Sequence, residues 1–141
     1  MLKRNYKEKV KKLLEDAEKA LNAQAWTSAS SSYDSAIEGI LRYYIKQKYN
    51  VNVGYNWKKV PRELENKGIK INDKLKELIL EFAELRYTSG MSIGYHAGIS
   101  WANEDIARKY KKLALKIYEE LLIMNDIWMS IINTISKKSN S

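Results

Sequence analysis

The chain has 141 residues, a length that corresponds to one domain large enough to bury a core. Hydrophobic residues make up 45% and charged residues 30%, which excludes a disordered chain, and six glycines and one proline are too few turn signals for an all-β fold. The formal net charge is +8, the absence of cysteine excludes a disulfide scaffold and a thiolate site, and the single histidine excludes a multi-histidine metal centre.

Two helices are predicted before residue 50, because apolar side chains recur there at the period of an α-helix. The first is expected over about 6–22 and the second over about 27–49, with a connector at 23–26. The second helix has an expected apolar face made of Ala29, Tyr33, Ala36, Ile37, Ile40, Leu41, Tyr44 and Ile45. A second row on the same helix contains small residues and predicts a close helix–helix seam: Ser28, Ser32, Ser35 and Gly39.

The middle of the chain predicts one short and one longer helix. A loop at 49–56 precedes a short helix over 57–66, and Asn72 or Asp73 is expected to cap a helix that runs to about Tyr87. The expected inward residues of these two helices are Trp57, Val60, Leu64, Leu75, Leu78, Ile79, Phe82 and Leu85.

The segment 88–100 contains half of the glycines, so we expect a loop or a broken helix there. Ser100 or Asn103 is expected to cap the last long helix. The expected core face of that helix consists of Ile106, Tyr110, Leu113, Ile117, Tyr118 and Leu121. Four substantial helices and one short helix together predict an all-α, antiparallel four-to-five-helix bundle.

The run 121–135 is more apolar than one bundle face requires, and it is too short for a transmembrane span. Within this run, Ile127, Trp128, Ile131 and Ile132 need a partner surface. Self-association supplies that surface in one interpretation, because exposed apolar patches mark interfaces. In the other interpretation the segment forms a fifth core element within the monomer.

The first twelve residues carry six basic side chains against one acidic side chain. In a helix Lys3, Lys7 and Lys11 would repel one another, and Arg4 would add to the positive charge that opposes the helix dipole. The sequence therefore favours a frayed arm or an arm with an anionic partner, of which nucleic acid is the obvious candidate; a solubilising terminus is the alternative. The segment lacks an apolar signal-peptide core, so we expect a cytoplasmic protein.

These features divide the chain into three expected parts. A basic N-terminal arm covers 1–12, the helical bundle covers 13–122, and an apolar C-terminal extension with a short basic tail covers 123–141.

Two segments resemble the HEPN superfamily of small helical bundles. LEDAEKALNAQAWTSASSSYDSAIEGILRYYI has its helix–turn–helix rhythm, and ELRYTSGMSIGYHAGISWANEDIARKYKKLALKIYEEL resembles its end, where an Arg-Tyr pair precedes a loop. The resemblance covers about 13–122 and looks closest to the archaeal PaREP1-type proteins. It implies a helical bundle that often dimerises. Several HEPN members are ribonucleases, often toxins paired with a nucleotidyltransferase antitoxin, and others have no known catalysis.

The resemblance implies one catalytic pair. Ribonuclease members carry an Arg, four to six residues and then a His, whereas here Arg86 and His96 are separated by nine residues. In metal-free RNA cleavage a His moves protons and an Arg holds the phosphate. The alternative is that His96 bonds a nearby carbonyl, while Arg86 interacts with its helix C-terminus or with Glu81 or Glu84.

Aromatic residues flank the glycine-containing segment and could stack on bases, although core and interface packing is the alternative for each of them. Together with the basic arm, the predicted nucleic-acid-binding residues are Lys3, Arg4, Lys7, Lys11, Tyr87, Tyr95 and Trp101.

Two functions remain open from the sequence. One is association with RNA or nucleotides, as a divergent or degenerate metal-independent ribonuclease of toxin–antitoxin type. The other is a non-catalytic interaction or self-assembly module. Expected partners are a second copy of the chain, RNA or a nucleotide, and a nucleotidyltransferase antitoxin; no membrane, cofactor or metal is expected.

Overall fold

The computed structural model describes the backbone of residues 2–89 and 102–123 and the side chains of 6–89 and 102–121. Within these ranges all regular secondary structure is helical and no strand is present, which confirms the predicted all-α bundle. Its elements are α1 (Leu2–Asn22), α2 (Trp26–Tyr49), α3 (Val60–Asn66), α4 (Asp73–Thr88), α6 (Glu104–Ile117) and the π-helical segment η1 (Tyr118–Ile123).

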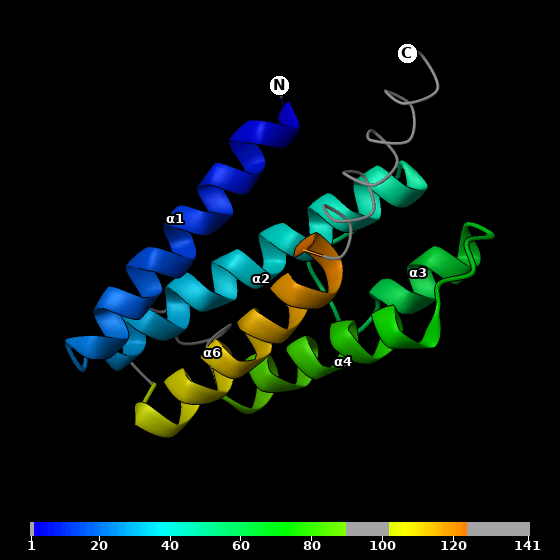
Figure 1. The fold of residues 1–141 in the computed structure, drawn as a ribbon. Helices are drawn as coiled ribbons and strands as arrows, with labels where there is room; N and C mark the ends of the chain where they lie inside the picture. Colours follow the sequence, from blue (N-terminus) through cyan, green and yellow to red (C-terminus); the bar gives the residue numbers. More distant parts are fainter. Residues whose placement is uncertain (1, 90–101, 124–141) are drawn as a thin grey trace, which may run out of the picture.

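The long helices alternate in direction along the chain, as Figure 1 shows. Helices α1 and α2 form an antiparallel pair, and α4 and α6 form a second pair, with α6 also packed along α2. The short helix α3 lies beside the beginning of α4. Helix α2 is therefore the central element, because α1, α4, α6 and η1 all contact it.

Helix α2 owes its central position to its apolar face. Of the residues predicted for that face, Ile37, Ile40, Leu41 and Ile45 are completely buried, whereas Tyr44 is half-buried. The apolar faces of the other helices meet it through Ala17, Leu78, Phe82 and Ile117, among others, all of which are fully buried. Burial of a large aliphatic or aromatic side chain contributes about 1.5–3 kcal/mol, so this shared core supplies the main stabilisation.

Local sequence signals set the helix ends. Of the two candidates for the cap of α4, Asn72 is the residue that acts, and its side chain accepts the Leu75 N–H. Asn103 caps α6 in the same way by accepting the Ile106 N–H. Both caps use an amide oxygen to satisfy a backbone donor that the first helical turn leaves unpaired.

The basic segment 2–12 is helical and continuous with the rest of α1, which therefore begins at Leu2 instead of near residue 6. Tyr6 docks this segment on α2: its ring stacks on Tyr43 with centroids 4.9 Å apart, and its hydroxyl donates to the Gly39 carbonyl. Val10 is also buried. These contacts outweigh the repulsion between lysines that predicted a frayed arm.

Two further expectations need correction. Helix α3 begins at Val60, and Trp57 lies in the preceding turn, because Pro61 is favoured in the first turn of a helix and sets its start. Of the predicted small-residue seam, Gly39 contacts α1 at close range through Tyr6, whereas Ser28 and Ser35 are exposed.

Candidate functional site

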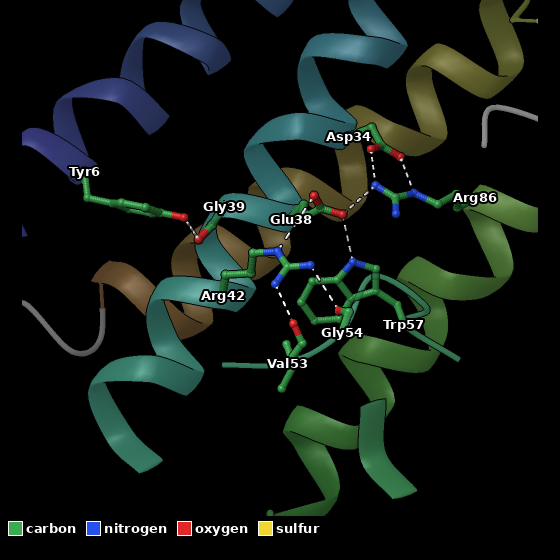
Figure 2. A network of polar contacts seen from close by, with 9 residues as sticks. All are labelled: Tyr6, Asp34, Glu38, Gly39, Arg42, Val53, Gly54, Trp57 and Arg86. Carbon is green, nitrogen blue, oxygen red and sulfur yellow. Dashed lines mark hydrogen bonds and ion pairs between the residues drawn. The ribbon is translucent and has the colours of Figure 1, made fainter. Parts of the chain in front are cut away.

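Arg86, the predicted catalytic arginine, lies in the last turn of α4 and points towards α2 (Figure 2). Its Nε donates to Asp34 Oδ2 at 3.1 Å and its Nη2 to Asp34 Oδ1 at 2.5 Å, a bidentate pair. The same Nη2 lies 3.0 Å from Glu38 Oε2. Bidentate, charge-assisted hydrogen bonds of this kind are stronger than neutral ones and fix the plane of the guanidinium.

The two carboxylates belong to a row of charged residues on α2. Asp34, Glu38 and Arg42 are spaced by four residues, so they stand one above the other on one side of the helix. Glu38 Oε1 lies 3.8 Å from Arg42 Nε. The row and Arg86 together carry two positive and two negative charges, so this polar layer is neutral overall.

The row also holds the loop between α2 and α3. Arg42 donates from Nη1 to the Val53 carbonyl at 2.8 Å and from Nη2 to the Gly54 carbonyl at 3.0 Å. Trp57 is buried and donates its indole N–H to Glu38 Oε2 at 2.9 Å. The buried indole N–H thereby has the acceptor that it requires.

Helix α6 joins the same layer through Tyr110. Its hydroxyl donates to Asp34 Oδ2 at 2.9 Å and lies 3.5 Å from the Ser89 hydroxyl. Burial, together with the charge of Asp34, raises the pKa of Tyr110 well above that of an ordinary tyrosine. Tyr110 is therefore a neutral donor throughout the physiological pH range. We call the six side chains that connect α2, α4, α6 and the α2–α3 loop the Arg86 network: Asp34, Glu38, Arg42, Trp57, Arg86 and Tyr110.

The charge of Arg86 is balanced within this network. Burial by itself lowers the pKa of Arg86, but the hydrogen bonds and negative charges of Asp34 and Glu38 raise it above its ordinary value. Its side chain is 21% exposed, so a phosphate would have to compete with two carboxylates that already lie within 3.1 Å. The geometry suits an arginine that positions α4 on α2 better than one that holds a substrate phosphate.

The predicted pairing of Arg86 with Glu81 or Glu84 is wrong. Neither of these two glutamates, which precede Arg86 on the same helix α4, is the carboxylate that pairs with it. Glu81 instead lies 3.3 Å from Lys116 on α6. Arg86 pairs with Asp34 and Glu38 on α2 because these carboxylates are partly buried and offer three geometrically matched contacts.

The other predicted site residues fall into two groups. Tyr87 is 76% exposed beside Arg86, and Lys7 and Lys11 lie along α1, half-buried and exposed respectively. Lys3 and Arg4 are in α1, and their side chains lie outside the described residues. The remaining predicted positions also lie outside the described residues: Tyr95, His96, Trp101, Ile127, Trp128, Ile131 and Ile132.

Asp34, Glu38 and Arg42 are not among the site residues that the sequence predicts. A signal for them exists: they are the first three charged residues of α2, they recur at every fourth position, and they border an apolar stripe. Charged residues in that position require partners from a neighbouring element. The identity of those partners is not encoded in the local spacing.

Over the two described ranges, no group of three His, Asp or Glu side chains is arranged to hold a metal ion, and no helix is long and apolar enough to cross a bilayer. Comparisons of the chain with family models, with curated proteins and with solved structures found no match.

Proposed function

We propose that this protein is a HEPN-like helical bundle that associates with RNA through the basic first half of α1. The observation that carries the proposal is that the basic segment forms a docked helix. A helix held by Tyr6 and Val10 presents Lys9, Lys11 and Lys12 to solvent from a fixed backbone. Lysines on a rigid scaffold bind a polyanion without the entropy cost of ordering a flexible arm.

The charge distribution supports this proposal. No acidic residue lies in the first turn of α1, and Glu8 is the sole acidic side chain among the first twelve residues. The next acidic residues, Glu15 and Asp16, lie further along the helix. The positive charge is thus concentrated at one end of α1, where it is not cancelled along the helix.

The test is binding of a fluorescein-labelled single-stranded RNA at several salt concentrations. Wild-type protein binds with an affinity that falls steeply with salt, because each phosphate contact releases a counterion. A charge-reduced variant replaces four predicted residues with glutamine: Lys3, Arg4, Lys7 and Lys11. If all four contact phosphates, the slope of log K against log salt falls by roughly 3 in this variant.

A matched control removes the same amount of charge elsewhere. It replaces four exposed lysines outside α1 with glutamine, namely Lys46, Lys70, Lys76 and Lys112. Both variants keep the wild-type circular dichroism spectrum if the fold is intact. Equal loss of affinity in the two variants would show that net charge, and not the α1 surface, drives binding. No binding by wild type would refute the proposal.

The balanced charge of Arg86 favours binding without cleavage. A metal-free assay of structured RNA with wild type and His96→Ala separates the two cases. We expect intact RNA with both proteins; cleavage by wild type that disappears in His96→Ala would establish a divergent ribonuclease instead. The proposed setting is the cytoplasm, and the family resemblance supplies the proposed partners, a second copy of the chain and a nucleotidyltransferase antitoxin.

A further inference from the structure

Two tyrosines stand out on the described surface. Tyr55 in the α2–α3 loop is 81% exposed and Tyr87 at the end of α4 is 76% exposed, whereas the next most exposed large apolar side chain, Leu115, is 45% exposed. Exposure of an aromatic ring to this extent forgoes the burial that stabilises most tyrosines in a small domain. Packing in the core therefore does not explain the position of either ring.

Each of these rings has a cation beside it. The Arg42 guanidinium carbon lies 4.6 Å from the centroid of the Tyr55 ring, and Lys58 Nζ lies 5.9 Å from the centroid of the Tyr87 ring. Contacts of this geometry are favourable because the face of an aromatic ring is negative. They also place a positive charge next to a flat surface that remains open to solvent.

The Arg86 network, most of which Figure 2 shows, fixes the backbone next to both tyrosines. Arg42 binds the carbonyls of Val53 and Gly54, immediately before Tyr55. Arg86 directly precedes Tyr87 in the sequence, and its side chain is anchored to Asp34 and Glu38 on α2. The two rings are therefore presented from backbone that is fixed by ion pairs and hydrogen bonds.

Lys58 connects the two ends of this surface. It follows Trp57, whose indole is held by Glu38, and it reaches from the loop of Tyr55 to the ring of Tyr87 on α4. Both Lys59 and Arg62 are exposed in the same segment. We call Tyr55, Lys58, Lys59, Arg62 and Tyr87 the tyrosine surface.

The nearby carboxylates are largely engaged. Glu63 accepts the Gly54 N–H at 3.2 Å, and Glu38 is shared among Arg42, Trp57 and Arg86. Glu84 on α4, one turn before Tyr87, and Glu65 on α3 are exposed. The surface thus combines two open aromatic faces with three exposed basic side chains, Lys58, Lys59 and Arg62, which suit a ligand that carries both planar rings and negative charges.

We infer that the tyrosine surface binds single-stranded RNA by stacking bases on Tyr55 and Tyr87, with Lys58 and Lys59 beside the phosphates. Unpaired bases stack on aromatic side chains irrespective of their identity, and lysines hold the backbone between them. This inference rests on the proposed association with RNA and assigns it a second surface, separate from the basic half of α1.

The test compares two labelled probes of equal length and charge, decauridylate and an abasic ten-phosphate strand. The variant is Tyr55→Ala/Tyr87→Ala, which removes two exposed rings and leaves every lysine in place. Stacking contributes about 1–3 kcal/mol per base, so decauridylate binding weakens roughly 5- to 140-fold for each base that loses its ring. Binding of the abasic strand is unchanged, because that strand has no bases to lose.

Two control variants make the result specific. Tyr55→Phe/Tyr87→Phe keeps the rings and retains wild-type affinity for decauridylate. Leu80→Ala/Leu115→Ala removes exposed apolar area of α4 and α6 and also leaves the affinity unchanged.

Several outcomes overturn the inference. If the double alanine variant binds decauridylate as tightly as wild type, base stacking at this surface is refuted, while the α1 proposal stands. If the double alanine variant loses the same affinity for decauridylate and for the abasic strand, the two rings act through charge or position and not through base stacking. If the double alanine variant differs from wild type only in its sedimentation coefficient and not in RNA binding, the tyrosine surface is a protein interface and the inference is refuted. If wild type binds neither probe, the proposed function fails as well.

Discussion

Replacement of Arg86 by alanine tests the structural role of the Arg86 network. The substitution removes two contacts with Asp34 and one with Glu38, and it leaves those carboxylates, 15% and 25% exposed, four residues apart on α2. Removal of one partner from a fully buried ion pair costs 3–5 kcal/mol. Because these groups are partly exposed and keep Tyr110, Trp57 and Arg42 as partners, we expect a loss of about 2–4 kcal/mol.

The assay is urea unfolding at 25 °C and pH 7, followed by circular dichroism at 222 nm. The matched control is Lys109→Ala, which breaks an ion pair with Asp105 at 3.0 Å whose side chains are 62% and 74% exposed. An exposed pair of this kind contributes less than about 0.5 kcal/mol. The contrast between the two variants isolates burial and geometry, because both remove one cation from one helix.

A double-mutant cycle distinguishes a specific pair from general loss of packing. If the guanidinium acts through Asp34, then Arg86→Ala and Asp34→Ala together cost less than the sum of the single variants. A cost for Arg86→Ala no larger than that of Lys109→Ala would refute the structural role. Arg86 would then be available for a phosphate, and the case for a binding-only protein would weaken.

Two further predictions concern stability. Burial raises the pKa of Tyr33 and Tyr110 above the ordinary value of 10. Their contribution to the free energy of unfolding is therefore complete below pH 10. It is lost as the pH rises further, by up to about 1.4 kcal/mol per pH unit for each tyrosine. Urea unfolding at pH 9 and pH 11 measures the loss, and an equal loss in Tyr33→Phe/Tyr110→Phe would contradict this cause. Asn72→Ala and Asn103→Ala each remove a helix cap and lower the free energy of unfolding by about 0.5–2 kcal/mol, whereas Asp at either position retains it; urea unfolding that shows no difference between Ala and Asp would contradict capping.

The helices and their buried faces follow from local sequence. The apolar stripe of α2 is visible as a helical period, and Ile37, Ile40 and Leu41 are buried as that period predicts. The sequence narrows each helix cap to two candidates, which include Asn72 and Asn103, because a cap depends only on the few residues around it. The repulsion between lysines led to a predicted start of α1 that is too late, because Tyr6 has its partners on another helix.

The candidate site was decided by packing between distant segments. Arg86 and Tyr87 could be identified from the sequence as residues of interest, but Asp34 lies 52 residues before Arg86 and 76 before Tyr110. Sequence spacing offers Arg86 only its helical neighbours, whereas the packing of α4 and α6 on α2 brings it to Asp34 and Glu38. The sequence by itself determined the helices, their faces and their caps, because these depend on contacts within a few residues. The tertiary structure alone decided which charges are paired and which aromatic rings stay exposed, because both depend on which helices meet.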